Sequence, residues 1–297
     1  MHIGEKIKRL RTAKLMTQSE LVGGEITRNM LSRIENGAAQ PSMATIKYIA
    51  ERLNVSPGFL LAEEEDEILY LKSVEISNIK KAYVNKDYSL CREMCINSEW
   101  RDDELLLILA ESTLYVAIEV FSHGNLHKAS ELFDMVIDYC EQTIYNTDII
   151  MAQAQGYFNY MSYISPTLDS NLSDISELSR LPFVCDEFLV YAKLFLSGEA
   201  QGYKNISDDD KMSFLQSGSS YEMHIKAKSL MEDNEYENAH SILYELLLND
   251  SYEMPEPMLY FVFGDLEICC KETENYKGAY EYSQNKIEIL EHMLADL

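Results

Sequence analysis

The sequence predicts an all-α protein with two domains, and three observations support this. Only 12 glycines and 6 prolines occur in 297 residues, too few for the many tight turns of sandwiches, barrels and α/β folds. Apolar residues recur three and four positions apart along most of the chain, which is the period of an amphipathic helix. The length suits two ordinary domains, and 46% hydrophobic residues are enough to build their cores.

The first two helices are predicted from apolar spacing and from a capping motif. In residues 3–10, isoleucine and leucine recur four and three positions apart between charged residues, which indicates an amphipathic helix. Thr17 lies three residues before Glu20, the spacing of a capping box that starts a second, short helix. Gly23 and Gly24 then end this helix, because glycine tolerates the left-handed conformation of a helix C-terminus.

Three more short helices follow in the first domain. Thr27 is predicted to cap the third helix, in which Met30, Leu31 and Ile34 form the apolar stripe. Pairs of proline and serine open a fourth and a fifth helix, and the fifth ends near residue 61. Five short helices with a tight turn between the second and the third form a helix-turn-helix arrangement.

The exposed start of the third helix carries groups that can read DNA bases. Arg28 and Arg33 supply guanidiniums, which match the two acceptors of guanine, and Asn29 matches the acceptor and donor of adenine. No acidic residue precedes Glu35 in this helix. Gln18, at the start of the second helix, can hold a phosphate. The alternatives are that this face is only solvated, or that the domain contacts protein instead of DNA.

The segments 16–21, 31–37, 41–42 and 50–55 resemble the Cro/C1-type (XRE) helix-turn-helix of phage repressors and many bacterial regulators. Their motifs, MTQSEL, LSRIENG, PS and AERLNV, have the order and spacing of that family, although the turn between the second and third helices is one residue shorter. The resemblance implies that residues 1–62 form a DNA-binding domain. The side chains that would face DNA, with the first near the phosphate backbone, are Gln18, Thr27, Arg28, Asn29, Ser32 and Arg33.

The distribution of charge agrees with a nucleic-acid module joined to an acidic one. The whole chain has 25 basic and 50 acidic residues, for a net charge of −25. Residues 1–60 contain nine lysines and arginines against five glutamates, a net charge of +4, so the remainder carries −29. A chance fluctuation in the charge of the first segment is the alternative.

Residues 63–297 are predicted to form a second domain of tetratricopeptide-like repeats. The acidic run 63–67 is both the linker and the first turn of a helix. Beyond it, an acid or amide, a large apolar residue, two polar residues and a small residue recur, with the small residues at Cys91, Ala129, Ala239 and Ala279. The pattern resembles tetratricopeptide repeats, in which the small residue lets paired helices approach closely. Five repeats are expected, with those in 140–215 degenerate; the alternative is an irregular helical bundle. Within that stretch, residues 148–164 and 183–196 are predicted to be helices, with breaks at Ser165–Pro166 and Leu181–Pro182.

Stacked helix pairs form a superhelix whose concave face suits a peptide. Gln155, Asn159 and Tyr163 recur every four residues, so they share one helical stripe, and an amide can bind a peptide backbone as both donor and acceptor. By their place in the family's repeats, further groove-lining residues would be Tyr83, Leu114, Ile118, Phe121, Tyr221, His224, Lys228 and Ile268. The alternative is that these side chains form the core between helices.

The combination of both domains resembles the peptide-pheromone regulators of Gram-positive bacteria, the RRNPP group with its Rgg- and PlcR-type members. That resemblance implies a cytoplasmic homodimer in which a short signalling peptide, held by the repeat domain, controls binding to double-stranded operator DNA. It implies a role for residues 63–297 in both sensing and dimerisation. The alternative is a DNA-tethered adaptor whose repeats bind a protein partner.

The sequence indicates neither catalysis nor a cofactor, metal site or membrane span. No glycine-rich phosphate loop or nucleophile motif occurs, so we expect no enzyme activity. Cys91 and Cys95 are too few ligands for a metal and are interpreted as buried thiols. His123 and His127 have ligand spacing, but a glycine and an asparagine between them indicate a turn. No signal peptide or long apolar run is evident.

Overall fold

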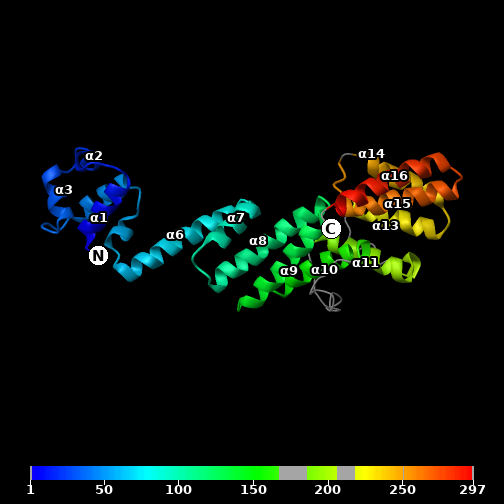
Figure 1. Cartoon of the computed structure of the whole chain (residues 1–297), viewed down its shortest axis with the longest axis horizontal. Helices are drawn as coiled ribbons and strands as arrows, with labels where there is room; N and C mark the ends of the chain where they lie inside the picture. Colours follow the sequence, from blue (N-terminus) through cyan, green and yellow to red (C-terminus); the bar gives the residue numbers. More distant parts are fainter. Residues whose placement is uncertain (1, 167–185, 206–217, 250, 296–297) are drawn as a thin grey trace. The chain divides into compact units, whose positions relative to one another are not determined.

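A computed structural model describes residues 2–166, 186–205, 218–249 and 251–295 (Figure 1). Within these ranges every regular element is a helix and no strand occurs, so the all-α prediction is confirmed. The chain divides into two compact units, Met1–Lys81 and Ala82–Leu297.

The first unit contains the five short helices that the sequence predicts. They are α1 (Ile3–Ala13), α2 (Gln18–Val22), α3 (Arg28–Glu35), α4 (Met43–Arg52) and α5 (Pro57–Leu61). Their core includes Ile7, Leu31 and Ile34, which have no exposed area. The predicted apolar stripe of α3 is wrong at Met30, which is 38% exposed, because the helix turns only two of its three apolar side chains toward the core.

Capping motifs set the starts of these helices. Thr17 and Glu20 form the predicted capping box: the Thr17 oxygen accepts from the backbone N–H of Glu20, and the Glu20 carboxylate accepts from that of Thr17. Thr27 caps α3 in the predicted way, by accepting from the backbone N–H of Met30 at 3.2 Å. Gly23 ends α2 with a φ of 57°, in the left-handed region that favours glycine.

Glycine allows α1 to approach α3 closely. A Cβ atom at Gly4 would lie 1.9 Å from the carbonyl oxygen of Ile34, well below any real contact distance. Ile34 belongs to α3. The close packing of α3 against α1 therefore requires a residue without a side chain at position 4.

The second unit is built from helices that pair along the chain. The helices from its start onward are the end of α6 (Glu64–Val84), α7 (Tyr88–Asn97), α8 (Asp103–Ser122), α9 (Leu126–Gln142), α10 (Asp148–Ile164), α11 (Glu187–Gln201), the 3-10 helix η2 (Tyr203–Asn205), α13 (Ser220–Glu232), α14 (Tyr236–Leu248), α15 (Glu256–Glu272) and α16 (Tyr276–Met293). Each of the pairs α8–α9, α13–α14 and α15–α16 packs closely together, as Figure 1 shows for the green and the yellow-to-red helices.

The repeat pattern predicted from the sequence reappears in the turns within four pairs. In each turn one residue has a positive φ, namely Lys86 (60°), Gly124 (83°), Asn234 (61°) and Glu274 (60°). The next residue is the N-cap of the second helix, and Asp87, Asn125 and Asn275 accept a backbone hydrogen bond there. The small residues four positions further, Cys91, Ala129, Ala239 and Ala279, are all buried. The tetratricopeptide-like pattern is therefore a structural repeat.

The middle of this unit departs from that pattern. The helix predicted over 148–164 is confirmed as α10, which ends at Ser165. A second helix, predicted over 183–196, is found as α11 at Glu187–Gln201. The break expected at Leu181–Pro182 and the thiol of Cys185 lie outside the described residues.

α6 lies where the sequence analysis places the domain boundary. The expected boundary between residues 62 and 63 falls in the short segment between α5 and α6, and it stays a prediction. Grouping by contacts divides the chain later, between Lys81 and Ala82, because most of α6 is assigned to the first unit.

One described helix, α8, is long and apolar enough to cross a membrane, which the sequence analysis did not expect. Half of its most apolar window is buried inside the protein, and α8 packs against both α7 and α9. A helix in the core of a helical repeat meets the same criteria of length and composition, since it is apolar on nearly all sides.

Candidate nucleic-acid interface and repeat-domain network

The start of α3 exposes most of the side chains that were predicted to contact DNA. Arg28, Asn29 and Arg33 are exposed, and their side chains make no hydrogen bond or ion pair with the described residues of the chain. Ser32 is half-buried beside them. Thr27 is exposed as well, with its oxygen already accepting from the backbone of α3. This helix therefore offers uncommitted guanidinium and amide donors on one surface.

A buried carboxylate joins the three helices that position this surface. Glu35, at the end of α3 and 4% exposed, accepts from Nε of Arg11 at 2.7 Å and from a second guanidinium nitrogen at 3.1 Å. Gln18 of α2 donates to the same carboxylate at 2.8 Å. The pKa of Arg11 is raised, chiefly by its hydrogen bond to Glu35. One N–H of the Gln18 amide is thus engaged inside the domain and the other stays available.

The turn after α2 is fixed from α4. The hydroxyl of Tyr48 donates to the carbonyl oxygen of Val22 at 2.8 Å, and Arg52 donates to that of Glu20 at 2.6 Å. Both acceptors lie at the end of α2, where intrahelical partners are missing. A Cβ at Gly23 would meet the Tyr48 hydroxyl at 2.4 Å, so the shortened turn requires glycine both for its φ and for space.

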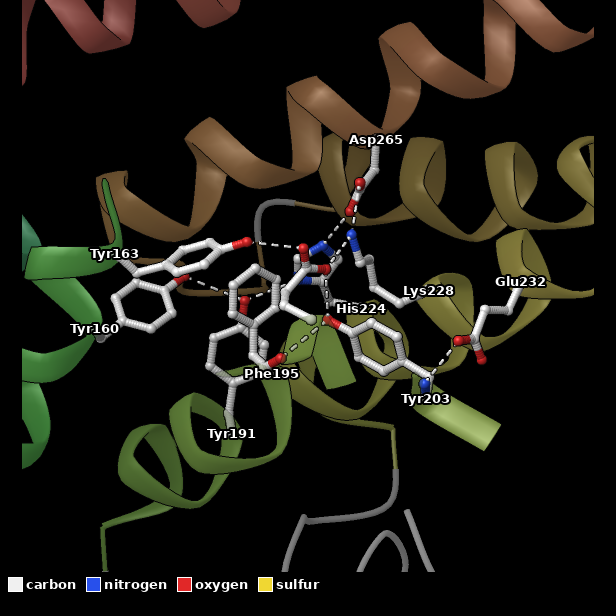
Figure 2. Close-up of polar contacts among 10 residues, drawn as sticks. Tyr160, Tyr163, Tyr191, Phe195, Tyr203, His224, Lys228, Glu232 and Asp265 are labelled. Atoms are coloured by element: carbon white, nitrogen blue, oxygen red, sulfur yellow. Dashed lines mark hydrogen bonds and ion pairs between the residues drawn. The ribbon is translucent and has the colours of Figure 1, made fainter. Parts of the chain in front are cut away.

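In the second unit, the structure places His224 in the core and not on an open surface. It has no exposed area, and both ring nitrogens are occupied (Figure 2). Nδ1 lies 2.8 Å from the hydroxyl of Tyr191, and Nε2 lies 2.9 Å from Oδ2 of Asp265. The hydroxyl of Tyr160 lies 3.3 Å from that of Tyr191. This row of contacts connects α10, α11, α13 and α15.

Lys228 continues the row with an internal ion pair. Its Nζ lies 2.7 Å from Glu199 and 3.1 Å from Asp265, and it stands 5.7 Å from the ring centre of Phe195 and 5.6 Å from that of Tyr203. The ammonium is therefore held by two carboxylates and two aromatic faces, a favourable setting for a largely buried cation.

We call the connected side chains the repeat-domain network: Tyr160, Tyr163, Tyr191, Glu199, Tyr203, His224, Lys228 and Asp265. At its open edge, Tyr163 is 45% exposed and donates to Glu199 at 2.9 Å. Figure 2 shows the labelled members converging from α10, α11, α13 and α15, with Tyr203 reaching them from η2. The network binds four helices of the unit to one another.

The charges in this network stabilise one another. Burial alone would raise the pKa of Asp265, but the hydrogen bond from His224 and the charge of Lys228 outweigh it and lower that pKa. Burial would likewise lower the pKa of Lys228, yet the charges of Asp265 and Glu199 raise it. Both groups are thus held in their charged forms.

The amide stripe on α10 is divided between core and surface. Gln155 is 2% exposed and donates to Oδ1 of Asn159 at 2.7 Å, whereas its own Oε1 has no hydrogen-bond partner in the described chain. Asn159 is half-buried. Tyr221 is half-buried also, and its ring stacks on that of Tyr191 at 5.1 Å.

Several residues predicted to line a groove are core residues instead. Leu114 and Phe121 are 1% exposed, and His224 is fully buried, because each faces a neighbouring helix. Asp265 and Glu199, which complete the network, could not be identified from the sequence. They stand 37 and 29 residues from Lys228, and no local pattern relates residues that far apart.

The cysteine pair is buried, and the two histidines have different partners. Cys91 and Cys95 are buried, and within the described ranges no set of three or more His, Cys, Asp or Glu side chains is arranged to hold a metal. His123 contacts the carbonyl oxygen of Glu119 at 2.7 Å, and His127 lies 3.6 Å from a carboxylate oxygen of Glu131, so the two imidazoles have separate partners.

Comparison with known proteins places the first unit in a family. Residues 7–60 match the family model described as helix-turn-helix (HTH_3). A segment of 97 residues, 32% of this chain, is 33% identical to the HTH-type transcriptional activator BcrR of Enterococcus faecalis. The matched segment spans 47% of that protein, about half its length.

Two solved structures align with almost the whole chain, at low identity and with low TM-scores. The crystal structure of Bacillus thuringiensis PlcR in complex with the peptide PapR7 and DNA is 17% identical, with 99% of this chain and 96% of that chain covered and a TM-score of 0.22. The apo form of the competence regulator ComR from Streptococcus vestibularis is 18% identical, with 97% and 91% covered and a TM-score of 0.21. The family match and the geometry of α2 and α3 agree: this chain carries at its N-terminus a helix-turn-helix domain of the XRE type.

Proposed function

We propose that this protein is a sequence-specific transcription regulator that reads double-stranded operator DNA with α3. The observation that carries the proposal is the surface of α3, where Arg28, Asn29 and Arg33 are exposed and uncommitted while Glu35, the helix's acid, is buried against Arg11. A recognition helix needs free donors and no exposed carboxylate, because DNA presents phosphates on either side of the groove.

Each side chain has a role that follows from its chemistry. Arg28 and Arg33 would bind guanine through paired N–H donors, and Asn29 would bind adenine. Thr27 and Ser32 would add hydroxyl contacts at the start and along the side of the helix. Gln18 would donate the remaining N–H of its amide to a phosphate. Its hydrogen bond to Glu35 holds the amide in place.

The test uses the full chain and a duplex selected by it from a randomised pool. Loss of one bidentate arginine should weaken binding about 10- to 100-fold, so Arg28→Ala and Arg33→Ala are expected to lose affinity in that range by fluorescence anisotropy. Lys47→Ala is the matched control, because it removes an equal charge from an exposed position on α4. Unchanged binding by both arginine variants would contradict the base-reading role of α3.

We also infer that a short signalling peptide, bound along α10 in the repeat domain, controls DNA binding. The support is the Oε1 atom of Gln155, a buried acceptor that lacks a partner in the described chain. Buried polar groups are normally satisfied, and the backbone N–H of an extended peptide is a suitable donor. Asn159 and Tyr163 lie on the same stripe with exposed surface, and Tyr221 and Lys228 lie on α13 as further candidate contacts, whereas buried His224 would act only through its neighbours.

Selection of randomised heptapeptides on the full chain tests this part. Gln155→Met should weaken the selected peptides about tenfold, because it removes the hydrogen bond at nearly constant volume. Gln142→Met, at an exposed position on α9, is the control. If no heptapeptide is retained while a protein from the same cells is, the adaptor alternative replaces peptide sensing.

In this proposal the protein acts in the cytoplasm as a homodimer. The dimer supplies two DNA-binding domains, one for each half-site of the operator. Two recognition helices engage both half-sites only when they are spaced by about one helical turn of DNA, roughly 34 Å, or a multiple of it. A ligand that binds one arrangement of the modules better than another would shift this spacing. Sedimentation of the full chain with a two-half-site duplex should give two protomers per duplex; one protomer would contradict this proposal.

A further inference from the structure

A second set of aromatic and acidic side chains lies at the start of the repeat domain, apart from the network around His224. We call Tyr83, Tyr88, Glu111 and Tyr115 the tyrosine–glutamate cluster. The rings of Tyr88 and Tyr115 stack 4.1 Å apart at 18°, and the ring of Tyr83 meets that of Tyr88 edge-on at 5.6 Å. Burial raises the pKa of Tyr83, and the neighbouring Glu111 carboxylate raises it further. The cluster thus joins α6, α7 and α8.

Part of this cluster faces solvent. Tyr115 is 37% exposed, and Tyr88, Tyr83 and Glu111 are half-buried. Glu111 and Tyr115 are four residues apart on α8, so the carboxylate and the ring lie side by side on one face of that helix. A ligand that contacts Tyr115 is therefore close to the Glu111 side chain.

The charge around the cluster is negative. Burial raises the pKa of Tyr115 first, and Glu111, Tyr88 and Asp186 raise it further. None of these three neighbours is a basic residue. Within the described chain, no lysine or arginine forms an ion pair with Glu111 or Asp186.

Elsewhere in the second unit, aromatic rings beside carboxylates hold the ammonium groups of lysines. In the repeat-domain network, Lys228 stands over the rings of Phe195 and Tyr203 while Glu199 and Asp265 hold its ammonium. Elsewhere in the same unit, Lys286 stands 5.6 Å over the ring of Tyr260 and 3.5 Å from Glu267. The tyrosine–glutamate cluster has the rings and the carboxylate without the cation.

We propose that the tyrosine–glutamate cluster binds a cationic side chain, a guanidinium or ammonium, of the peptide that the repeat domain holds. The inference rests on the proposed peptide function and specifies the chemistry of its ligand. The flat guanidinium of arginine suits the site best, because it stacks on an aromatic face and donates in its own plane to a carboxylate. Tyr88 stacks on Tyr115, so the ligand would contact the 37% of Tyr115 that stays exposed.

The site has a consequence for specificity. A carboxylate in the peptide at this position would meet Glu111 and Asp186 and be repelled, so the site selects against acidic ligands as well as for basic ones. The charge of −29 outside residues 1–60 adds a long-range attraction for basic peptides, which salt would weaken.

The test uses two synthetic peptide libraries on the immobilised full chain. Both are acetylated, amidated heptapeptides with uncharged residues randomised at six positions; the central residue is arginine in one and citrulline in the other. Citrulline has nearly the shape of arginine without its charge. We expect the arginine library to be retained about tenfold better in low salt, as measured by mass spectrometry of the eluted peptides.

Variants of the cluster residues test whether the preference for arginine over citrulline arises at the tyrosine–glutamate cluster. Glu111→Gln and Tyr115→Leu should each reduce the arginine-to-citrulline ratio to about two or less, with the citrulline library retained as before, which shows that the unit is folded. Glu141→Gln, an exposed acid on α9, is the matched control and should keep the wild-type ratio.

The outcomes separate this inference from the proposed function. Equal retention of both libraries by the wild-type chain overturns the cationic site and leaves peptide binding intact. A wild-type preference that persists in both cluster variants also overturns it, because the cation then binds elsewhere. Retention of neither library overturns peptide binding itself and the cationic site with it.

Discussion

Substitution of Gly4 tests whether α1 sets the position of the recognition helix. In Gly4→Ala, the added Cβ would lie 1.9 Å from the carbonyl oxygen of Ile34 and 2.9 Å from its carbonyl carbon. Real Cβ atoms essentially never approach closer than 3.0 Å, so α1 and α3 must separate by about 1 Å. Both clashing atoms belong to the backbone, and no side-chain rotation can relieve them.

The expected magnitude follows from the size of the domain. Overpacking of a well-packed core costs about 1–3 kcal/mol of stability. We expect a cost of about 3 kcal/mol here, because the clash is with backbone atoms. A domain of this size has only ~3–9 kcal/mol of stability in total. Gly4→Ala should therefore remove a third or more of it, and it should also weaken DNA binding, since α3 shifts relative to α2.

Hydrogen exchange on the full chain measures this loss in the first unit separately from the second. Peptides from α1 and α3 should exchange about 100-fold faster in Gly4→Ala, and peptides from α13–α16 should be unchanged. Gly58→Ala is the matched control, because its Cβ meets only Oγ of Ser56 at an ordinary 3.6 Å. If the two variants exchange alike, the inferred contact between α1 and α3 is refuted.

Two further predictions concern the network and a helix cap. The pKa of Asp265 is lowered in the folded protein, so its contribution is present above the unfolded value of about 3.9 and is lost as pH falls through the folded value. Asp265→Asn should lower the unfolding free energy by about 3 kcal/mol at pH 7 and flatten its decline below pH 5 in urea titrations; a parallel decline would contradict this. Thr17→Ala removes the capping box with Glu20 and should destabilise the first unit by about 1 kcal/mol, measured by exchange in α2, whereas Thr17→Ser should restore it.

The helices and their ends could be predicted from the sequence because their causes are local. A capping box relates Thr17 to Glu20, three residues apart, and the turn before Cys91 or Ala129 repeats within a few residues. Such motifs are visible in the order of residues alone. The chemistry of the α3 surface was predictable for the same reason, since Arg28 and Arg33 lie on the exposed side of a short helix.

Only the tertiary structure decided which polar residues are buried and with which partners. His224 and Lys228 were predicted to line a groove, but Asp265 and Glu199 approach them from other helices. His224 is fully buried as a result, and Lys228 is largely buried. Packing between helices also sets the rotation of each helix about its axis. This rotation leaves Met30 outside the core and brings Gln18 within hydrogen-bond distance of Glu35. An amphipathic period gives the face of a helix, whereas contacts between residues far apart in the chain determine what covers that face.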